Sequence, residues 1–337
     1  MAELKMALHG QARRRSLDVV ISAGIFVGLY GLLIVVSPIA AAPFLITNFV
    51  VLASTLAIAA MGTALVLIVG GFDLSVAGII SLTNVIAATA MAQYPDLAWL
   101  IAALLIVLGG AIGAVNGILV SRLGLPSLGV TLSTYIVLTG IALIVLPAPG
   151  GFVPPDWAAV LTGNVGPIPF AAIVLLVLAL LWVLFTRTRT GMTVFAVGGD
   201  ARAARLSGIP VMRVQVLAYA IAGAIYACAG LFFSALTATG SPNAGTPFLL
   251  SCFAAAALGL VSFRGGKGSA VAAIFGAATL TVLPKLLFSL GLADFWVGAF
   301  QGVIVLIALS IPAIVARLSR LGRIRRSTHV IPVEATR

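Results

Sequence analysis

Apolar stretches of about twenty residues recur along most of the chain, and they constrain the fold more than any other feature. A helix of about 20 residues crosses the ~30 Å hydrocarbon layer of a bilayer. The stretches lack the alternating apolar and polar residues of membrane β-strands, which are about 10 residues long. Because only helices and closed barrels satisfy their backbone groups in lipid, the sequence predicts an all-α, polytopic bundle of transmembrane helices.

The composition agrees with this prediction. Of 337 residues, 62% are hydrophobic and 8% are charged, whereas a soluble domain carries about 25% charged residues. Cys228 and Cys252 lie within apolar runs, which is typical of small buried residues and not of a disulfide or metal pair. His9 and His329 lie near the chain ends. No histidine-based triad or metal cluster can therefore be assembled in the membrane region, so we expect a protein that is not an enzyme and binds no metal.

Ten spans fit the hydropathy pattern best. They cover residues 18–36, 49–69, 75–92, 98–120, 127–146, 168–186, 214–236, 248–262, 269–288 and 295–316. The first run resembles the start of a secretory signal peptide, and "IAAAPF" (39–44) offers a small-residue cleavage pattern. That run is longer than the ~7–15 apolar residues of a typical signal peptide, which favours a retained first span.

The basic residues predict the topology. With ten spans both termini lie on one side, and that side receives every one of the 19 basic residues except Lys285. The positive-inside bias makes it the cytoplasm, which explains the +11 net charge without a nucleic-acid partner. We expect an N-terminal tail at 1–17, a membrane domain at 18–316 with a cytoplasmic loop at 187–213, and a basic tail at 317–337 along anionic lipid.

Three further segments stand out between the spans. The Pro- and Gly-rich segment 147–167 is the largest external loop. Glycine-rich breaks recur in both halves, as "VGGFDLS" (69–75) and "RGGKGS" (264–269), a weak indication of two related halves as in many transporters. The second break is not a phosphate-binding P-loop, because Lys267 is followed by Gly268 instead of Ser or Thr. The chain therefore shows no motif for hydrolysing ATP itself.

The cytoplasmic loop contains a short cationic segment, "GGDARAARLSGIP". Asp200 is predicted to cap a helix over Ala201–Ser207, and Gly208 to end it in the left-handed conformation. Arg202 and Arg205 share one face. A helix this short has only marginal stability in water. We therefore expect that the segment docks in a partner's groove or lies on the membrane, or that it is a solvated loop whose arginines only enforce the topology. The candidate docking residues are Gly199, Asp200, Ala201, Arg202, Ala203, Ala204, Arg205, Leu206, Ser207 and Gly208.

Asp73 is the acidic residue closest to the membrane interior. Gly70 and Gly71 permit a break before it, and Asp73 is predicted to cap a new helix through Leu74 and Ser75. A charge at mid-bilayer costs about 2.5–3.5 kcal/mol or more, so backbone N–H groups are the expected partners. The cap is the favoured interpretation, and a direct role in binding the solute is the alternative.

Several spans also carry neutral polar residues. Hydroxyl and amide groups suit a hydrated path for a neutral polyol, although each could instead form an interhelical hydrogen bond. Gly113 and Gly117 have the small-xxx-small spacing of closely packed membrane helices. The candidate pathway residues are Asp73, Ser75, Asn84, Asn116, Thr131, Ser133 and Thr134.

Four stretches in this order make a specific combination: "GGFDLSVAGIISL", "GAIGAVNGILVSRLGLPSLGVTLST", "AVGGDARAARLSGIPV" and the run from "YAIAGAIYACAG" to "SFRGGKGS". Over residues 45–315 the chain resembles the permease subunits of bacterial ABC importers for simple sugars of the ribose/xylose/galactose type, within the branched-chain-amino-acid-like permease superfamily. Two positions depart from the family pattern: Ala77 precedes Gly78, and Pro284–Lys285 stands where Asn-Gly is common. These departures leave the sugar open.

The resemblance has implications for partners and mechanism. It implies that residues 198–209 lie in the cytoplasmic loop that couples to the ATPase. It also implies pairing with a second permease copy or paralogue, an ABC ATP-binding subunit that carries the ATP and Mg²⁺, and a periplasmic or lipid-anchored sugar-binding protein, all at the bacterial inner membrane. No cofactor is expected in this chain. The alternatives are an ion-coupled secondary transporter, for which Asp73 is the only plausible relay, and a channel or scaffold.

Overall fold

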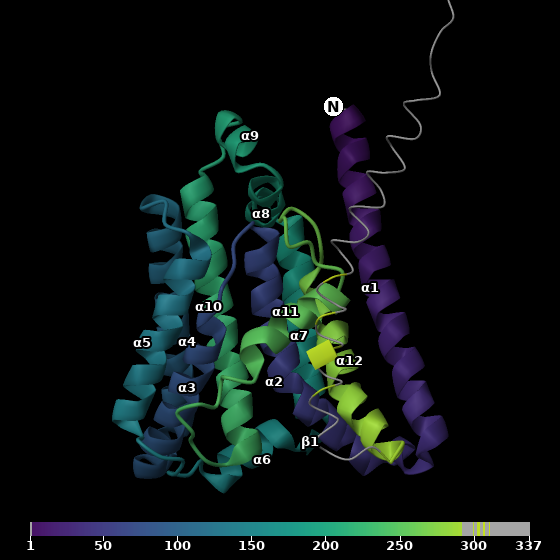
Figure 1. Ribbon diagram of the computed structural model, residues 1–337, viewed down its shortest axis with the longest axis vertical. Coiled ribbons are helices and arrows are strands. Elements are labelled where there is room, and N and C mark those ends of the chain that lie inside the picture. The colour runs from purple at the N-terminus through teal and green to yellow at the C-terminus, as the bar shows by residue number, and fades with distance from the viewer. Residues whose placement is uncertain (1, 292–298, 300–301, 304–305, 307–309, 311–337) are drawn as a thin grey trace, which may run out of the picture.

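The protein is an all-α bundle whose long helices run side by side (Figure 1). The computed structural model describes residues 2–291 and positions 299, 302, 303, 306 and 310, with side chains from residue 16 onward. The elements are α1 Ala2–Val36, η1 Pro38–Ala41, α2 Pro43–Ile68, α3 Ser75–Gln93, η2 Pro95–Leu97, α4 Ala98–Arg122, α5 Ser127–Val145, α6 Pro155–Thr162, β1 Asn164–Val165, β2 Ile168–Pro169, α7 Phe170–Arg187, α8 Arg189–Gly199, α9 Ala201–Leu206, α10 Val211–Thr237, α11 Phe248–Leu258 and α12 Ala270–Ser289.

Eight helices in the described part of the chain are long and apolar enough to cross a membrane. They are α1 from Ser16 onward, α2, α3, α4 with η2, α5, α7, α10 and α12. This confirms a polytopic α-helical membrane protein. The expected tenth span at 295–316 and the basic tail at 317–337 lie outside the described residues, apart from five isolated positions.

The expected eighth span, 248–262, is wrong as a full crossing. Helix α11 has only 11 residues, a length of about 16 Å at 1.5 Å per residue, or about half of the hydrocarbon layer. Pro247 stands before its first residue, and Leu260 adopts a positive φ of 57° just beyond its end. The apolar run continues past this break, which is why its hydropathy suggested a longer helix.

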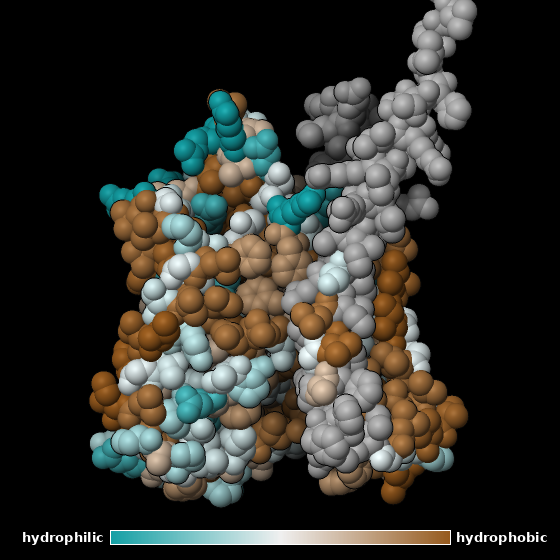
Figure 2. Space-filling model, in the orientation of Figure 1, coloured by the Kyte–Doolittle hydropathy of each residue, from teal (hydrophilic) through white to brown (hydrophobic). Residues whose placement is uncertain are grey.

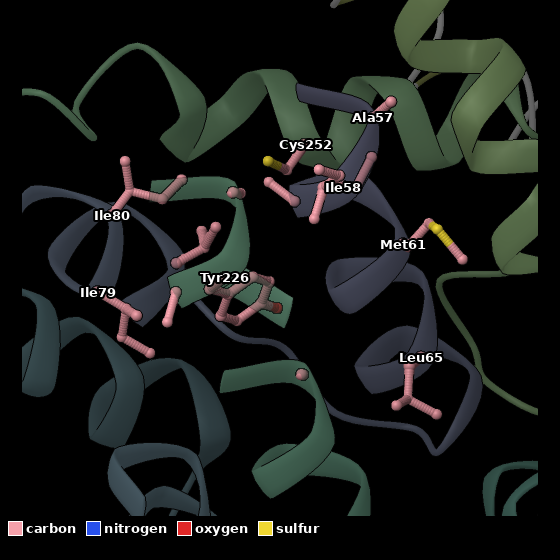
Figure 3. Packing of buried hydrophobic residues seen from close by; sticks show 14 of the residues in the cluster. Ala57, Ile58, Met61, Leu65, Ile79, Ile80, Tyr226 and Cys252 are labelled. Atoms are coloured by element: carbon pink, nitrogen blue, oxygen red, sulfur yellow. The ribbon is translucent and has the colours of Figure 1, made fainter. Parts of the chain in front are cut away.

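The core lies around α2, whose most apolar window is 94% buried. Ile58 on α2, Ile80 on α3, Tyr226 on α10 and Cys252 on α11 are fully buried and lie close together (Figure 3). Helices α4 and α10 approach closely: a Cβ added to Gly113 would lie 2.1 Å from the carbonyl oxygen of Tyr219. The expected role of small residues in helix packing is thus confirmed for Gly113. Both cysteines are free thiols, as expected.

Helices α3 and α11 are each preceded by a non-helical segment that enters the bundle, residues 69–74 and 238–247 (Figure 1). The two segments enter from opposite ends. The first starts at the end that carries α8 and α9, here called the α9 end, and the second at the end that carries α6, the α6 end. Discontinuous helices of this kind are typical of transporters. The segment 238–247 is tied to α3, because Ser81 Oγ accepts a 2.9 Å hydrogen bond from the amide of Gly245.

Candidate coupling surface and translocation path

Helix α9 is a short helix held at both ends. The Oδ1 atom of Asp200 accepts hydrogen bonds from the amides of Arg202 and Ala203, both 2.9 Å long. At the other end Gly208 has a φ of +78°, and its amide donates to the carbonyl of Arg205 at 3.0 Å. The predicted cap and the predicted left-handed stop are both confirmed. The helix ends at Leu206, one residue earlier than expected.

The position of α9 exposes most of its surface. Figure 1 shows it standing beyond the ends of α4, α5 and α10, and Figure 2 shows hydrophilic residues gathered there. Ala204 is buried against the bundle, whereas Arg202 and Arg205 are exposed. Leu206 is 84% exposed although it is a large apolar side chain. The helix therefore presents two cations and an apolar tip away from the membrane-spanning bundle.

Helix α8 connects α9 to the bundle, and sequence reasoning missed it by treating 187–198 as loop. The side chain of Thr188 caps it by accepting a 3.0 Å hydrogen bond from the amide of Gly191. Val194, Phe195 and Val197 are buried, and the ring of Phe195 packs edge-on against Trp182 of α7. A Thr two residues after a span, followed by apolar residues at helical spacing, was the signal available. Through α8, the docking candidate is rigidly seated on the core.

Glycines join three segments at the α9 end: Gly70 after α2, Gly198 in α8, and Gly265 and Gly266 in the loop between α11 and α12. We call these four residues the glycine junction. A Cβ at Gly198 would lie 1.8 Å from the carbonyl oxygen of Ile68, and a Cβ at Gly265 would lie 2.4 Å from the carbonyl oxygen of Gly198. The backbones of these segments are therefore in direct contact, with no side chain between them.

Asp73 begins a chain of hydrogen bonds that reaches from α3 to α5. Its Oδ1 accepts from the amide of Ser75 at 2.9 Å and from the hydroxyl of Ser75. The Oγ atom of Ser75 accepts a 3.0 Å bond from the amide nitrogen of Asn116, whose Oδ1 accepts from Thr134 at 2.6 Å. We call these four residues the polar chain. Asp73 is fully buried, and its Oδ2 has no hydrogen-bond partner among the residues that the structure describes.

Two other predicted pathway residues hold backbone segments in place. Thr131 Oγ1 accepts a 3.0 Å hydrogen bond from the amide of Leu74 and so fixes the start of α3. Asn84 lies apart from the polar chain. Its Nδ2 donates to the carbonyl of Thr239 at 3.0 Å, and its Oδ1 accepts from the amide of Ser241 at 2.7 Å. These bonds tie segment 238–247 to α3.

A cavity of about 720 Å³ lies between α4 and α5. Its polar lining is Asn116, Ser133 and Thr134, and the rest of its wall is apolar. Two members of the polar chain thus face the cavity, while Asp73 and Ser75 lie behind its wall. Around the cavity, α4 and α5 expose large apolar side chains such as Val115 and Val137. The arrangement offers neutral hydrogen-bonding groups in an otherwise apolar, membrane-facing surface.

Basic residues gather at the α9 end in the described part of the chain with placed side chains. They are Arg122, Arg187, Arg189, Arg202, Arg205, Arg213, Arg264 and Lys267, which lie in α9 or at or beyond the ends of α4, α7, α8, α10 and α11. Lys285 is the exception, near the far end of α12. The predicted one-sided distribution of charge is therefore also found in three dimensions.

Comparisons with known proteins place the chain in a family. Residues 45–309 match the family described as "Branched-chain amino acid transport system / permease component". The chain belongs to this family. This confirms the resemblance drawn from its motifs, and with its apolar helices the permease is a multi-pass protein of the bacterial inner membrane. No solved structure matches the chain.

Curated relatives of the permease include a probable ABC transporter permease and two sugar import permeases. It is 35% identical to the probable ABC transporter permease protein y4mJ of Sinorhizobium fredii, over 76% of this chain and 77% of the relative. It is 32% identical to the ribose import permease protein RbsC of Escherichia coli K12, over 75% and 80% of the two chains. The galactose/methyl galactoside import permease protein MglC of the same organism is 28% identical, over 80% and 86%.

Proposed function

We propose that the permease is the membrane-spanning subunit of an ATP-driven importer that moves a monosaccharide or a similar small polyol into the cytoplasm by alternating access. The relatives named for ribose and galactose import support the substrate class. The chain has no P-loop motif, so a separate ABC ATP-binding subunit carries the ATP and Mg²⁺. A sugar-binding protein on the outer side and a second permease copy or paralogue complete the assembly.

The observation that carries this proposal is α9, a capped and exposed helix that projects from one end of the bundle. The basic residues at this end make it the cytoplasmic face by the positive-inside rule. Because Ala201 and Ala203 keep the exposed face of the helix narrow, a partner surface can approach it closely, with Leu206 as an apolar contact. The ATPase therefore docks on α9.

The cavity between α4 and α5 is the proposed start of the translocation path. Ser133 and Thr134 offer uncharged donors and acceptors that match the hydroxyl groups of a sugar, and the buried Asn116 holds the hydroxyl of Thr134 in place. The apolar rim of α4 and α5 is suited to contact with lipid or with the second permease copy. Asp73 and Ser75 orient the amide of Asn116 from behind the wall, and do not contact the solute themselves.

The contacts at the α9 end connect docking to the cavity. When the ATPase subunits close, they displace α9 and α8, and the glycine junction transmits the displacement to segment 69–74. Asp73 lies in that segment, and the polar chain links it to Asn116 and Thr134 in the cavity wall. ATP can shift the access state only if the ATPase binds the two conformations of α9 with different affinity.

Transport in proteoliposomes tests the proposal. We expect uptake of a monosaccharide that requires the ATPase, ATP and the binding protein, and that persists when ion gradients are dissipated. Asp73 is buried, and its Oδ2 atom has no hydrogen-bond partner among the described residues. Because buried ionisable groups serve as ion relays, this observation favours one rival, an ion-coupled secondary transporter. Gradient-driven uptake by the permease alone, without ATP, would establish that rival instead. Passive sugar flux through the permease alone would identify a channel.

A further inference from the structure

The loop between α11 and α12 carries two exposed cations on a tight turn. Here the 262–268 loop denotes the segment from Ser262 to Gly268. The amide of Ser262 donates to the carbonyl of Lys267 at 3.1 Å, and the amides of Arg264 and Gly265 donate to Ser262 Oγ and its carbonyl, both at 3.2 Å. These bonds close the turn and leave the Arg264 and Lys267 side chains exposed.

The same loop is fixed to the helix that carries α9. The amide of Gly266 donates a 2.8 Å hydrogen bond to the carbonyl of Ile68, and a Cβ on Gly266 would lie 2.7 Å from the Cα of Gly199. Gly199 is the residue immediately before the Asp200 cap. Since no side chain separates the two backbones, the 262–268 loop and the base of α9 form one rigid unit.

Cations outnumber acidic groups on this unit four to one. Arg202, Arg205, Arg264 and Lys267 are all exposed, and the adjacent Asp200 has one carboxylate oxygen engaged by backbone amides. No ion pair neutralises these four cations within the described residues. The positive-inside rule requires cations in the loop, but it does not require the loop to be packed against the base of the docking helix. A partner that covers this unit must present acidic groups.

We propose that the 262–268 loop is a second docking element for the ATPase, with Arg264 and Lys267 facing carboxylates on the same ATP-binding subunit that grips α9. This inference rests on the proposed function. Two separate contacts stop the ATPase from rotating about α9 as a single pivot. They also apply its motion directly to the segment that leads into α12, in addition to the route through α8.

Charge reversal in the full-length permease tests this inference. The variant Arg264→Glu/Lys267→Glu is expected to weaken ATPase binding about tenfold at low salt, with the difference shrinking as salt screens the contact. Arg187→Glu/Arg189→Glu is the matched control, because it makes the same charge change at the opposite end of α8. We expect less than about a threefold effect there. The neutral variant Arg264→Gln/Lys267→Gln should weaken ATPase binding by an amount between those of the charge-reversal variant and the control.

The other outcomes separate the possible failures. Equal weakening by both double variants would mean that only the general positive charge matters, which would overturn the inference. An effect seen in nanodiscs with anionic lipid and lost in zwitterionic lipid would assign the two cations to lipid headgroups, and would also overturn it. Loss of ATPase binding on Leu206→Glu, but not on the loop variant, would remove the second docking element and leave the proposed function intact. If neither variant affected binding, the assignment of α9 would itself fail.

Discussion

The amide nitrogen of Gly266 lies 2.8 Å from the carbonyl oxygen of Ile68, and this hydrogen bond joins the end of α2 to a loop that is far away in the chain. Gly198 of α8 packs directly against the same carbonyl. The end of α2, the end of α8 and the turn before α12 therefore meet without intervening side chains. This contact makes the base of α9 the place where a partner bound there can act on α2, α8 and the turn before α12 together.

Gly198→Ala should disrupt this contact. Its methyl group would lie 1.8 Å from the Ile68 carbonyl oxygen and 2.7 Å from the Gly266 amide nitrogen. Overpacking of this kind costs about 1–3 kcal/mol, so we expect a lower thermal unfolding midpoint and loss of coupled sugar uptake. Gly199→Ala is the control, because nothing lies within 4 Å of the added Cβ. Equal stability and uptake in the two variants would contradict the glycine junction.

Asp200→Ala should weaken ATPase binding without destabilising the bundle. The substitution removes the two amide contacts that cap α9, a loss of about 0.5–2 kcal/mol for a helix of six residues. We expect several-fold weaker association of the ATPase in a pull-down titration, and an unchanged unfolding midpoint. Asp200→Asn and Asp200→Ser keep a capping oxygen, so they should retain most of the binding. Wild-type affinity in the alanine variant would show that the cap has no part in docking.

Leu206→Glu should abolish most ATPase association. The wild-type side chain is 84% exposed and makes the apolar tip of α9, so a carboxylate there costs the permease little stability but must be desolvated in the docked complex. Membrane insertion should be normal, as measured by labelling of a cysteine placed at position 203 from the cytoplasmic side. Labelling of that cysteine from the outside would invalidate the assigned orientation.

Asp73→Asn should be mild, whereas Asp73→Ala should not. Asparagine can still accept the hydrogen bonds from Ser75, but alanine leaves the buried amide of Ser75 unpaired, at a cost of about 1–3 kcal/mol. We expect ATP-dependent uptake to be retained in the first variant and a lower unfolding midpoint in the second. Complete loss of uptake by a well-folded Asp73→Asn protein would instead indicate that the carboxylate acts in transport directly.

Asn84→Ala and Asn116→Ala should have different effects, although both asparagines are fully buried. Removing Asn84 leaves the Ser241 amide unpaired and loosens segment 238–247, so we expect lower stability, by about 1–3 kcal/mol, with an unchanged KM for the sugar. Removing Asn116 changes the cavity wall, so we expect a raised KM. A raised KM in the Asn84 variant, with an unchanged KM in the Asn116 variant, would move the path away from the cavity between α4 and α5.

Local features of the sequence predicted the parts of the structure that depend on local physics. Eight of the ten spans expected from the long apolar runs coincide with helices long and apolar enough to cross a membrane, because helix length and hydropathy are both encoded in consecutive residues. Asp200 and Gly208 predicted the two ends of α9, since capping requires only neighbouring backbone groups.

The remaining features depend on contacts between distant segments. The apolar run around α11 gave no sign that Leu260 would break it, and α8 was hidden by its mixed polarity. Asp73 was predicted to cap the helix that became α3. It does accept a hydrogen bond from the amide of Ser75, but Leu74 occupies the N-cap position, and the connection of Asp73 to Thr134 crosses three helices. Likewise, the motif "RGGKGS" was recognised as a break, whereas its contact with Gly198 follows only from the tertiary fold.

The glycine junction consists of backbone atoms only, so it has no chemical preference for any transported solute. The contact between Gly198, Gly265 and Ile68 would transmit the same push whatever side chains surround the path. Substitutions in the cavity wall can thus admit a different solute while the glycine junction stays unchanged. One type of ATP-binding subunit can in this way drive permeases that differ only in the solute they transport.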